Sequence, residues 1–361
     1  ASITGEAVSA PTPTERADAS SPSELEVVRV EPYNAESPAR ALAPAITPAV
    51  NAYVRTNFGV PVLSNQHAIQ VDGAVEHPVT LSIDALRGMP RHSVTATMEC
   101  AGNDRLGMRP LPVGEPWRYG ALSTVTWTGV SLVDVLGLAG VQSDAVEVLL
   151  TAADAGPRED AEDVVRFARS LPLREALHRD TLLALDMNGA PLTPDHGAPV
   201  RLAVPGWYGM ASVKWVTRIE VLRVPFTGYF QRQRYVYDEP GGITPVDRMR
   251  VKSIVTSPVE GARVGRTVVV TGWAWSGDGA IVAVDVCVDG GTAWQSATVG
   301  APASAHAWTP WHTELELSRA GRIVLQSRAS DASGATQPDA IVWNRLGYGN
   351  NAIRHVVVEV E

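Results

Sequence analysis

The pattern of hydrophobic residues changes near residue 250, and this change divides the chain into two parts. After that point, short β-rich segments alternate with turn signals such as Asp289-Gly290-Gly291 and Asp331-Ala332-Ser333-Gly334. Short strands at regular spacing are typical of a β-sandwich. The expected strands are 267–274, 281–288, 294–299, 312–317, 322–328 and 354–360.

The two parts predict two different folds. Residues 250–361 favour an immunoglobulin-like β-sandwich. Residues 25–249 mix short strands with short helices in an irregular order, which predicts an α+β fold rather than a doubly wound sheet. A length of 361 residues also favours two domains over one core. Residues 1–24 are rich in Ala, Ser, Thr, Pro and Glu and predict a flexible N-terminal tail.

Local patterns in the first domain predict particular elements. Residues 131–138 read as a helix, with Ser131 as the N-cap and Asp134 completing a capping box. Apolar runs bounded by turns are typical of buried strands. The expected strands of this domain are 94–98, 181–186 and 200–204.

Charge and hydropathy argue against several classes of function. A net charge of −9 argues against nucleic acid, because phosphate backbones are bound by clustered Lys and Arg. No apolar run reaches the roughly 20 residues of a membrane helix, so no membrane span is expected. Since no leader precedes Ala1, a cytoplasmic location is favoured, and a periplasmic one follows if a leader was removed.

The chain has two cysteines, Cys100 and Cys287, and no Cys-x-x-Cys motif. Zinc-finger, iron–sulfur and c-type haem sites are therefore not expected. Cys100 follows a β-run and precedes the small, turn-prone residues 101–103, which would leave its sulfur at a strand end with open space above it. A lone cysteine is most often a packed core residue, whereas a thiolate is also a soft ligand for a redox metal. Cys287, in the alternating run 284–288, is expected to be a packed strand residue.

The residues around Cys100 favour a metal ligand over a packed core cysteine. Glu99-Cys100-Ala101-Gly102-Asn103-Asp104-Arg105 resembles the molybdenum-ligand motif of the sulfite oxidase family. Further stretches resemble that family in the same order along the chain, at 53–55, 117–124, 195–201, 205–209, 212–215, 272–277 and 289–294. The resemblance covers roughly residues 25–361. It implies a molybdopterin-binding catalytic domain over 25–249 followed by an immunoglobulin-like dimerisation domain over 250–361.

The resemblance implies roles for residues on the substrate side. Cys100 would be the thiolate ligand of molybdenum. Arg55 and Arg105 match anion-binding arginines, and a guanidinium offers the forked, permanently charged donors that an oxyanion needs. Trp117 matches a tryptophan that walls the substrate pocket.

An active-site tyrosine is also implied. Tyr235, which follows Gln233-Arg234, matches the family position, and Tyr237 is the alternative assignment. A phenol there can hydrogen-bond a metal-bound oxygen and help to move a proton.

A further set of residues matches positions that hold the pterin and its phosphate. Arg and Lys charges with hydroxyl donors suit a phosphate group. The set comprises Asn57, Asp154, His196, Arg201, Ser212 and Lys214. A zinc site at His196 is not expected, because no second His or Cys lies at ligand spacing.

The chain departs from the family pattern at two places. Animal and plant sulfite oxidases carry two arginines after Cys-Ala-Gly-Asn, and here the first of these is Asp104. They also carry an arginine directly before a late glycine, where this chain has Leu346. Arg345 lies one residue early and is not expected to bind substrate. An apolar residue at this position is similar to assimilatory nitrate reductases.

The favoured function is therefore oxidation of a small oxyanion, sulfite, to sulfate by a molybdenum–molybdopterin homodimer. No haem segment is recognised in this chain, so electrons would pass to an external acceptor such as a cytochrome. The first alternative is the same cofactor acting on nitrate or a sulfoxide as a reductase. The second is a cofactor-free binding module. The immunoglobulin-like part and the N-terminal tail support this alternative.

Overall fold

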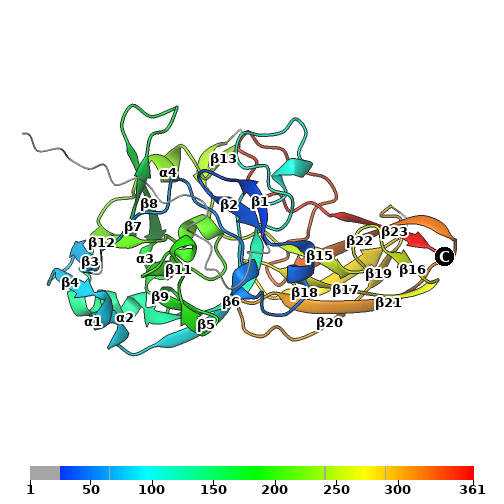
Figure 1. Cartoon of the computed structure of the whole chain (residues 1–361), viewed down its shortest axis with the longest axis horizontal. Helices are drawn as coiled ribbons and strands as arrows, with labels where there is room; N and C mark the ends of the chain where they lie inside the picture. Colours follow the sequence, from blue (N-terminus) through cyan, green and yellow to red (C-terminus); the bar gives the residue numbers. More distant parts are fainter. Residues whose placement is uncertain (1–24, 65, 240, 289) are drawn as a thin grey trace, which may run out of the picture.

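The computed structural model describes residues 25–64, 66–239, 241–288 and 290–361, and two groups of β-sheets divide them (Figure 1). The predicted tail over 1–24 lies outside the described residues. The last strand of the first group is β14 (Gly242–Pro245), and the first strand of the second group is β15 (Lys252–Ser257). The first group occupies the left of Figure 1 and the second group the right.

Two five-stranded sheets form the framework of the first domain. One has the order β10-β9-β6-β5, with β11 paired to β9, and the other has the order β4-β3-β12-β7-β8. In the second sheet β12 runs parallel to β3 and antiparallel to β7. The bounds are β3 (Ala68–Gly73), β4 (Val79–Ser82), β5 (His92–Glu99), β6 (Leu122–Ser131), β7 (Glu147–Gly156), β8 (Val165–Pro172), β9 (Leu182–Met187), β10 (Ala190–Pro191), β11 (Arg201–Ala203) and β12 (Val216–Leu222). The expected strands at 94–98, 181–186 and 200–204 are thereby confirmed.

The helices of this domain are short. They are α1 (Ile83–Arg87), α2 (Leu132–Ala139), α3 (Leu173–Ala176) and α4 (Tyr229–Arg232), with 3₁₀ turns at Ala39–Leu42, Ala49–Asn51, Arg105–Gly107, Pro194–His196 and Gly209–Ala211. Two small hairpins complete the domain, β1 (Glu26–Arg29) with β2 (Asn34–Glu36), and β13 (Val236–Glu239) with β14.

The predicted helix at 131–138 is α2, and Ser131 is its N-cap. The capping box was wrong, because the Ser131 hydroxyl makes no hydrogen bond to the first turn. It donates instead to the backbone oxygen of Arg179, at 2.8 Å. A hydrogen bond to a distant residue thus takes the place of the predicted capping bond within the helix.

The second domain is a sandwich of two sheets, as expected. Their orders are β15-β17-β21-β20 and β16-β23-β22-β18-β19. Apolar side chains of both inner faces form its core, among them Val270, Val286, Trp311, Leu325 and Val358. The remaining bounds are β16 (Arg263–Val264), β17 (Thr267–Trp275), β18 (Ile281–Cys287), β19 (Trp294–Ser296), β20 (Thr298–Val299), β21 (Thr309–Glu316), β22 (Gly321–Asp331) and β23 (His355–Val360).

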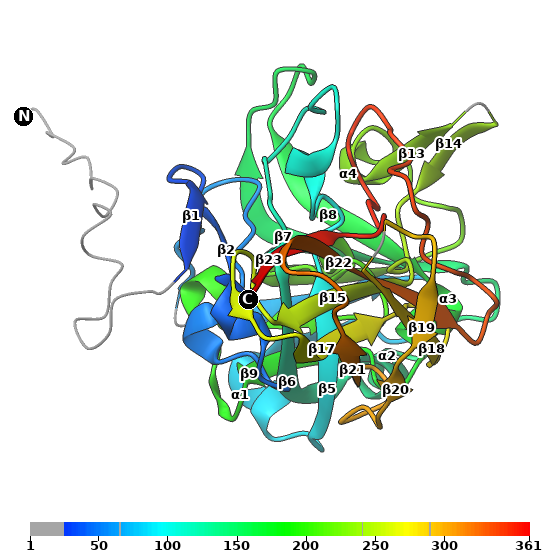
Figure 2. The same ribbon diagram turned by 90° about the vertical axis from the view of Figure 1, so that its right-hand side faces the viewer.

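The two domains share part of their core. The largest cluster of buried apolar residues lies in the first domain, yet it includes Ile254, Trp275, Trp308, Leu346 and Tyr348 of the second. Viewed from the right of Figure 1, the second domain lies directly in front of β5 and β6 (Figure 2). The second domain therefore closes one side of the first.

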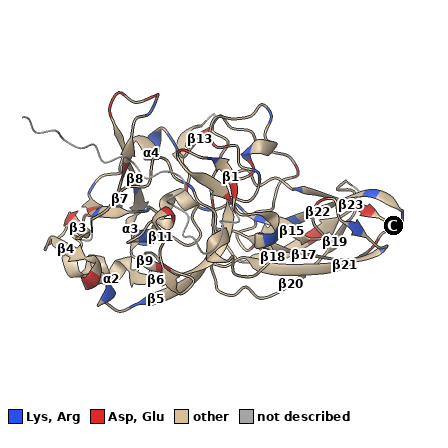
Figure 3. Cartoon of the chain, viewed as in Figure 1, with Lys and Arg blue, Asp and Glu red and all other residues tan. Residues whose placement is uncertain are grey.

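Two further observations concern the surface. Basic and acidic residues are scattered over both domains (Figure 3). In the described part of the chain, every helix is too short or too polar to span a bilayer.

Gly272 provides a test of the close packing within the sandwich. A Cβ at this position would overlap the backbone oxygen of Ile254 and the ring of Trp311. We expect Gly272→Ala to lower the free energy of unfolding by about 1–3 kcal/mol, because overpacking forces neighbouring atoms to move. Denaturant unfolding measures this change.

Gly265→Ala is the control, because its Cβ would lie 3.8 Å from the nearest atom, the backbone oxygen of Thr267. Equal stability of the two variants would contradict the packing described for β17.

Candidate active site

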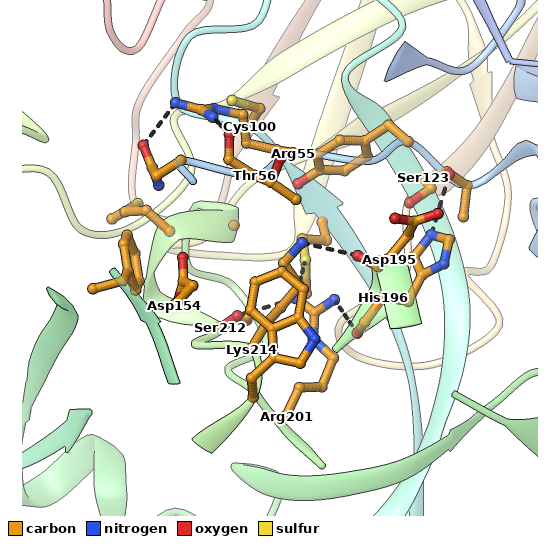
Figure 4. Close-up of a pocket in the computed structure, with 18 of the residues that line it drawn as sticks. Arg55, Thr56, Cys100, Ser123, Asp154, Asp195, His196, Arg201, Ser212 and Lys214 are labelled. Atoms are coloured by element: carbon orange, nitrogen blue, oxygen red, sulfur yellow. Dashed lines mark hydrogen bonds between the residues drawn. The ribbon is translucent and has the colours of Figure 1, made fainter. Parts of the chain in front are cut away.

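A cavity opens in the first domain where several strand ends and loops converge (Figure 4). It holds about 750 Å³ of space not filled by protein atoms, open solvent included. Its lining is Ala52, Tyr53, Arg55, Thr56, Asn57, Met98, Cys100, Ser123, Trp127, Asp154, Phe167, Met187, Asp195, His196, Arg201, Gly209, Met210, Ser212, Lys214, Trp215 and Tyr235. Most of the residues predicted from sequence therefore lie around one space.

Cys100 lies where β5 ends and the chain turns. Its backbone N–H donates to the oxygen of Ala121 at 2.8 Å, and the N–H of Asn103 donates to the Cys100 oxygen at 2.9 Å. These bonds fix a tight turn at the floor of the cavity. Burial raises the pKa of the Cys100 thiol, while the nearby charge of Arg55 acts in the opposite direction. Cys287 is buried in β18 of the other domain, as predicted, and no disulfide joins the two cysteines.

Arg55 and Tyr235, both predicted for the substrate side, lie at one corner with Asn57. The Arg55 guanidinium donates to Asn57 Oδ1 at 2.8 Å and also to the backbone oxygen of Thr56. Asn57 Nδ2 donates to the Tyr235 hydroxyl at 3.3 Å. Burial alone lowers the pKa of Arg55, but interaction with Tyr235 and Cys100 raises it above its ordinary value. Asn57, expected to contact the pterin, thus bridges the two substrate-side residues.

Arg105 does not line the cavity. Its side chain is 3% exposed and donates to the backbone oxygen of Leu346 at 3.0 and 3.2 Å and to that of Glu115 at 2.7 Å. Glycines make room for its guanidinium, since a Cβ at each would crowd it; they are Gly102, Gly114 and Gly347. Arg105 therefore supports the Cys100 turn from behind, and its charge acts to lower the pKa of the thiol.

Two other sequence predictions are placed by the structure. Trp117 is fully buried in the apolar cluster that contains Cys100 and does not line the cavity, so it packs behind the site instead of walling a pocket. Arg345, which was not expected to bind, pairs with Asp238 at the surface at 3.0 Å.

The opposite end of the cavity is cationic. Arg201 donates to the backbone oxygens of His196 at 3.1 Å and Ser212 at 3.0 Å, and Lys214 Nζ donates to that of Asp195 at 2.8 Å. Neither cation forms an ion pair with a carboxylate in the described part of the chain. Burial, with the charge of Arg201, lowers the pKa of Lys214 to about 7.

The pKa values of His196 and Asp154 are also shifted by burial and by these charges. Burial, with the charges of Arg201 and Lys214, lowers the pKa of His196 to about 3, so the ring is neutral near pH 7. Burial raises the pKa of Asp154 to about 6, against the charge of Lys214.

Buried cations that form no close ion pair favour a bound anion. Figure 4 shows Cys100 and Arg55 at one end of the cavity and Arg201, Ser212 and Lys214 at the other. This donor set fits an elongated group that carries a thiolate-bound metal at one end and a phosphate at the other.

Beneath Cys100, a buried polar network joins the two domains. Lys252 Nζ, at the start of β15, lies 2.9 Å from Glu99 Oε1 and 2.6 Å from Asp104 Oδ2. Trp275 Nε1 donates to Glu99 Oε2 at 3.1 Å. Both carboxylates flank the Cys100 turn, so residues of the second domain fix it. No role was predicted for Glu99 or Lys252. The available signals were the position of Glu99 beside Cys100 in the motif and that of Lys252 as a charged residue at the head of a β-run.

Lys252→Met tests this network. The variant leaves the buried Glu99 without its cation and removes one of the two cations beside Asp104, which keeps Arg354 at 3.5 Å. We therefore expect the free energy of unfolding to fall by about 3–5 kcal/mol. Thermal and denaturant unfolding measure it.

Arg263→Met is the control, because that arginine pairs with Glu361 at an exposed site. A loss of less than about 1 kcal/mol in Lys252→Met, as in an ordinary surface pair, would contradict the role assigned to the network.

Comparison with known proteins gives the family. Residues 57–230 match the model of the oxidoreductase molybdopterin-binding domain, and residues 244–361 match that of the Mo-co oxidoreductase dimerisation domain. Chicken sulfite oxidase is 36% identical over 90% of this chain and 75% of its own length. Rat mitochondrial sulfite oxidase is 34% identical over 93% of this chain, which spans 66% of that relative.

A solved structure shows the same arrangement. The sulfane dehydrogenase SoxCD from Paracoccus pantotrophus superposes with a TM-score of 0.79 at 31% identity, covering 100% of this chain and 96% of that one. The barley NADH nitrate reductase is 31% identical over 94% of this chain and 41% of its own length. With its cysteine turn, its cationic cavity and both matching domains, the chain belongs to the sulfite oxidase family of molybdopterin oxidoreductases.

Proposed function

We propose that this protein oxidises sulfite to sulfate and passes the electrons to an external acceptor such as a cytochrome. The observation that carries this proposal is the position of the Cys100 thiol in one cavity with Arg55 and Tyr235. A sulfur ligand for the metal and a permanently charged group for an oxyanion thus face the same space. Curated relatives named sulfite oxidase support this substrate, and the molybdopterin-domain match favours an enzyme over the cofactor-free binding module.

The cofactor would be held from both ends of the cavity. Cys100 would bind the metal, and Arg201, Ser212 and Lys214 would bind the phosphate of molybdopterin. His196 and Asp154 line the same cavity and would contact the pterin. When bound, the molybdenum centre supplies oxygen-atom transfer coupled to two-electron redox chemistry.

The chain's own residues orient the substrate. Arg55 would hold the oxyanion through charge-assisted hydrogen bonds, which are worth about 1.5–3 kcal/mol each. The Tyr235 hydroxyl lies at the same corner, where it can donate to an anion oxygen or exchange a proton with it. Asn57 keeps both groups in place through its amide. Burial of the corner strengthens each of these interactions by excluding water.

Assembly is part of the proposal. Residues 244–361 match a dimerisation domain, which supports a homodimer formed through the β-sandwich. The external acceptor then approaches a cavity that each protomer carries separately.

A second candidate function follows from the reduced positive charge of the substrate side. Leu346 is buried where relatives of the sulfite oxidase type are expected to carry an arginine, and Arg105 is turned away. This change favours a substrate other than sulfite, such as a sulfane sulfur compound, nitrate or a sulfoxide. The structural neighbour is named a sulfane dehydrogenase, and one relative is named a nitrate reductase. Turnover of sulfite, thiosulfate and nitrate with artificial electron dyes discriminates among these substrates.

Cys100→Ser tests the metal ligand. Since a hydroxyl is a poor soft ligand, we expect this variant to fold, to show a changed metal absorption spectrum and to lose sulfite-dependent ferricyanide reduction by at least about 1,000-fold. Cys287→Ser is the control and should retain the activity, with a stability cost of about 1–3 kcal/mol. Near-normal turnover by Cys100→Ser would refute the assignment.

Lys214→Met tests the cationic end. With one buried charge fewer, we expect purified protein to retain several-fold less molybdopterin, as measured by pterin fluorescence and metal content. A bound phosphate should also raise the lysine pKa from about 7, so that the wild-type protein takes up a proton on binding cofactor above pH 7.

The stability of the cofactor-free protein should respond to the same group. A lysine whose pKa is lowered on folding binds fewer protons in the folded state between about pH 7 and its ordinary pKa, so the stability of the apoprotein should rise across that window. Lys214→Met should flatten this rise. Arg223→Met, at an exposed pair with Asp144, should leave cofactor content and the pH profile unchanged. Equal cofactor content in the two variants would contradict the assignment.

A further inference from the structure

Three hydrogen-bond donors converge on one neutral oxygen at the substrate corner. Asn57 Oδ1 accepts from the Arg55 guanidinium at 2.8 Å, from the Arg158 guanidinium at 3.0 Å and from the Tyr235 hydroxyl at 3.4 Å. An amide oxygen has two lone pairs, so it satisfies at most two good donors at a time. The corner therefore has more donor capacity than the protein itself uses.

Arg158 lies in the connection between β7 and β8 and reaches the cavity through Asn57, a lining residue to which it is hydrogen-bonded. None of the sequence motifs pointed to it. Its guanidinium lies over the rings of Phe58 and Phe230, at 4.7 and 5.5 Å from the centroids. It also donates to the backbone oxygen of Asn57 at 3.2 Å. Its Nε is buried and has no hydrogen-bond partner among the described residues.

Arg158 lies near other positive charges. Within the described ranges, neither Arg158 nor Arg55 forms an ion pair, whereas the neighbouring Arg234 pairs with Asp160 at 3.0 Å. Burial lowers the pKa of Arg158, and the charges of Arg55 and Arg234 act in the same direction. Two uncompensated guanidinium groups thus meet at one amide oxygen, and an anion placed there would relieve their repulsion.

The segment around Leu346 supplies no cation to the substrate corner. Leu346 is 2% exposed, and its backbone oxygen takes two donors of Arg105, so this segment offers the cavity no cation. A second cation for an anionic substrate must then come from elsewhere, and Arg158 of the β7–β8 connection shares Asn57 Oδ1 with Arg55.

We propose that Arg158 is the second anion-binding arginine of the substrate pocket, and that it exchanges its bond to Asn57 Oδ1 for an oxygen of the bound oxyanion. The proposal rests on the proposed function and specifies its substrate class. Two guanidinium groups select a doubly charged oxyanion, such as sulfite or sulfate, over a neutral sulfoxide. Arg158 contributes to ground-state binding and leaves the chemical step to the cofactor.

The test compares substrate affinity with turnover in the molybdenum-loaded, full-length protein. We expect Arg158→Gln to weaken sulfate binding in calorimetry about 10- to 100-fold, which is what the loss of one charge-assisted hydrogen bond gives. The KM for sulfite should rise by a similar factor while kcat changes less than about threefold, because the interaction is made equally in ground state and transition state. Arg158→Lys keeps the positive charge but loses the forked geometry of the guanidinium. Its sulfate affinity should therefore lie between those of the wild type and Arg158→Gln.

Arg232→Gln is the matched control, since it removes one charge from an exposed position on the adjacent α4. Its sulfate affinity should equal that of the wild type. Should Arg158→Gln fail to fold, Arg158→Lys decides the question, with a wild-type dissociation constant counting against the proposal.

Several results would overturn the proposal. Sulfate affinity of Arg158→Gln within twofold of the wild type, even with a lowered Tm, would leave Arg158 a purely structural residue. Absence of measurable sulfate binding by the wild type would have the same consequence. If the wild type binds sulfate through Arg158 but fails to oxidise sulfite, the proposed function falls while the anion site stands.

Discussion

The buried contact between Glu99 and Lys252 is the interaction on which the rest of the site depends. Both side chains are at most 2% exposed, so each charge has lost its water and is stable only beside its partner. The partners come from different domains and meet directly beneath the Cys100 turn. Asn350 adds a second tie, because its amide donates to the backbone oxygen of Asp104 at 3.0 Å while its own backbone oxygen accepts from Lys252. The first domain alone would leave Glu99 without its cation, so the metal-binding turn is a product of both domains.

The cofactor cavity shows the opposite arrangement, because its cations form no close ion pair with a carboxylate in the described part of the chain. Arg201 and Lys214 are held by backbone oxygens instead of carboxylates. His196 is kept neutral by the same surroundings, which lower its pKa to about 3. A neutral ring has one donor and one acceptor, and its two contacts, to the Thr193 hydroxyl at 2.8 Å and the Ala52 backbone oxygen at 3.3 Å, assign these roles. Nε2 then donates to Ala52 and Nδ1 accepts from Thr193, which orients the ring before any ligand arrives.

Much of this structure could be read from the sequence, and the failures have specific causes. Strands such as β5 and β17 were predicted because apolar runs bounded by turns carry a local signal. β15 was missed because it begins with the buried polar residues Lys252 and Ser253, whose partners lie far away in the chain. The motif correctly indicated that Arg105 lies near Cys100, but a sequence motif does not determine the orientation of a side chain. That direction is set by a backbone oxygen 241 positions away, at Leu346.

The segment around Leu346 also explains how the second domain can influence the choice of substrate. Tyr348, two residues further on, stacks on Tyr235 with ring centroids 5.2 Å apart, and its other neighbour is the Arg105 guanidinium. Burial raises the pKa of Tyr348 to about 12, so it remains neutral and supports Tyr235 without adding charge. This side of the corner is therefore aromatic and uncharged, and it constrains where the phenol of Tyr235 lies.

Positive charge for an oxyanion must then come from the first domain, where Arg55 and Arg158 of the β7–β8 connection both donate to the amide oxygen of Asn57. Moving a cation from one wall to another changes the direction from which the anion is held while leaving the metal ligand in place. Two members of one family can thus share a cofactor geometry and differ in the substrates that they orient.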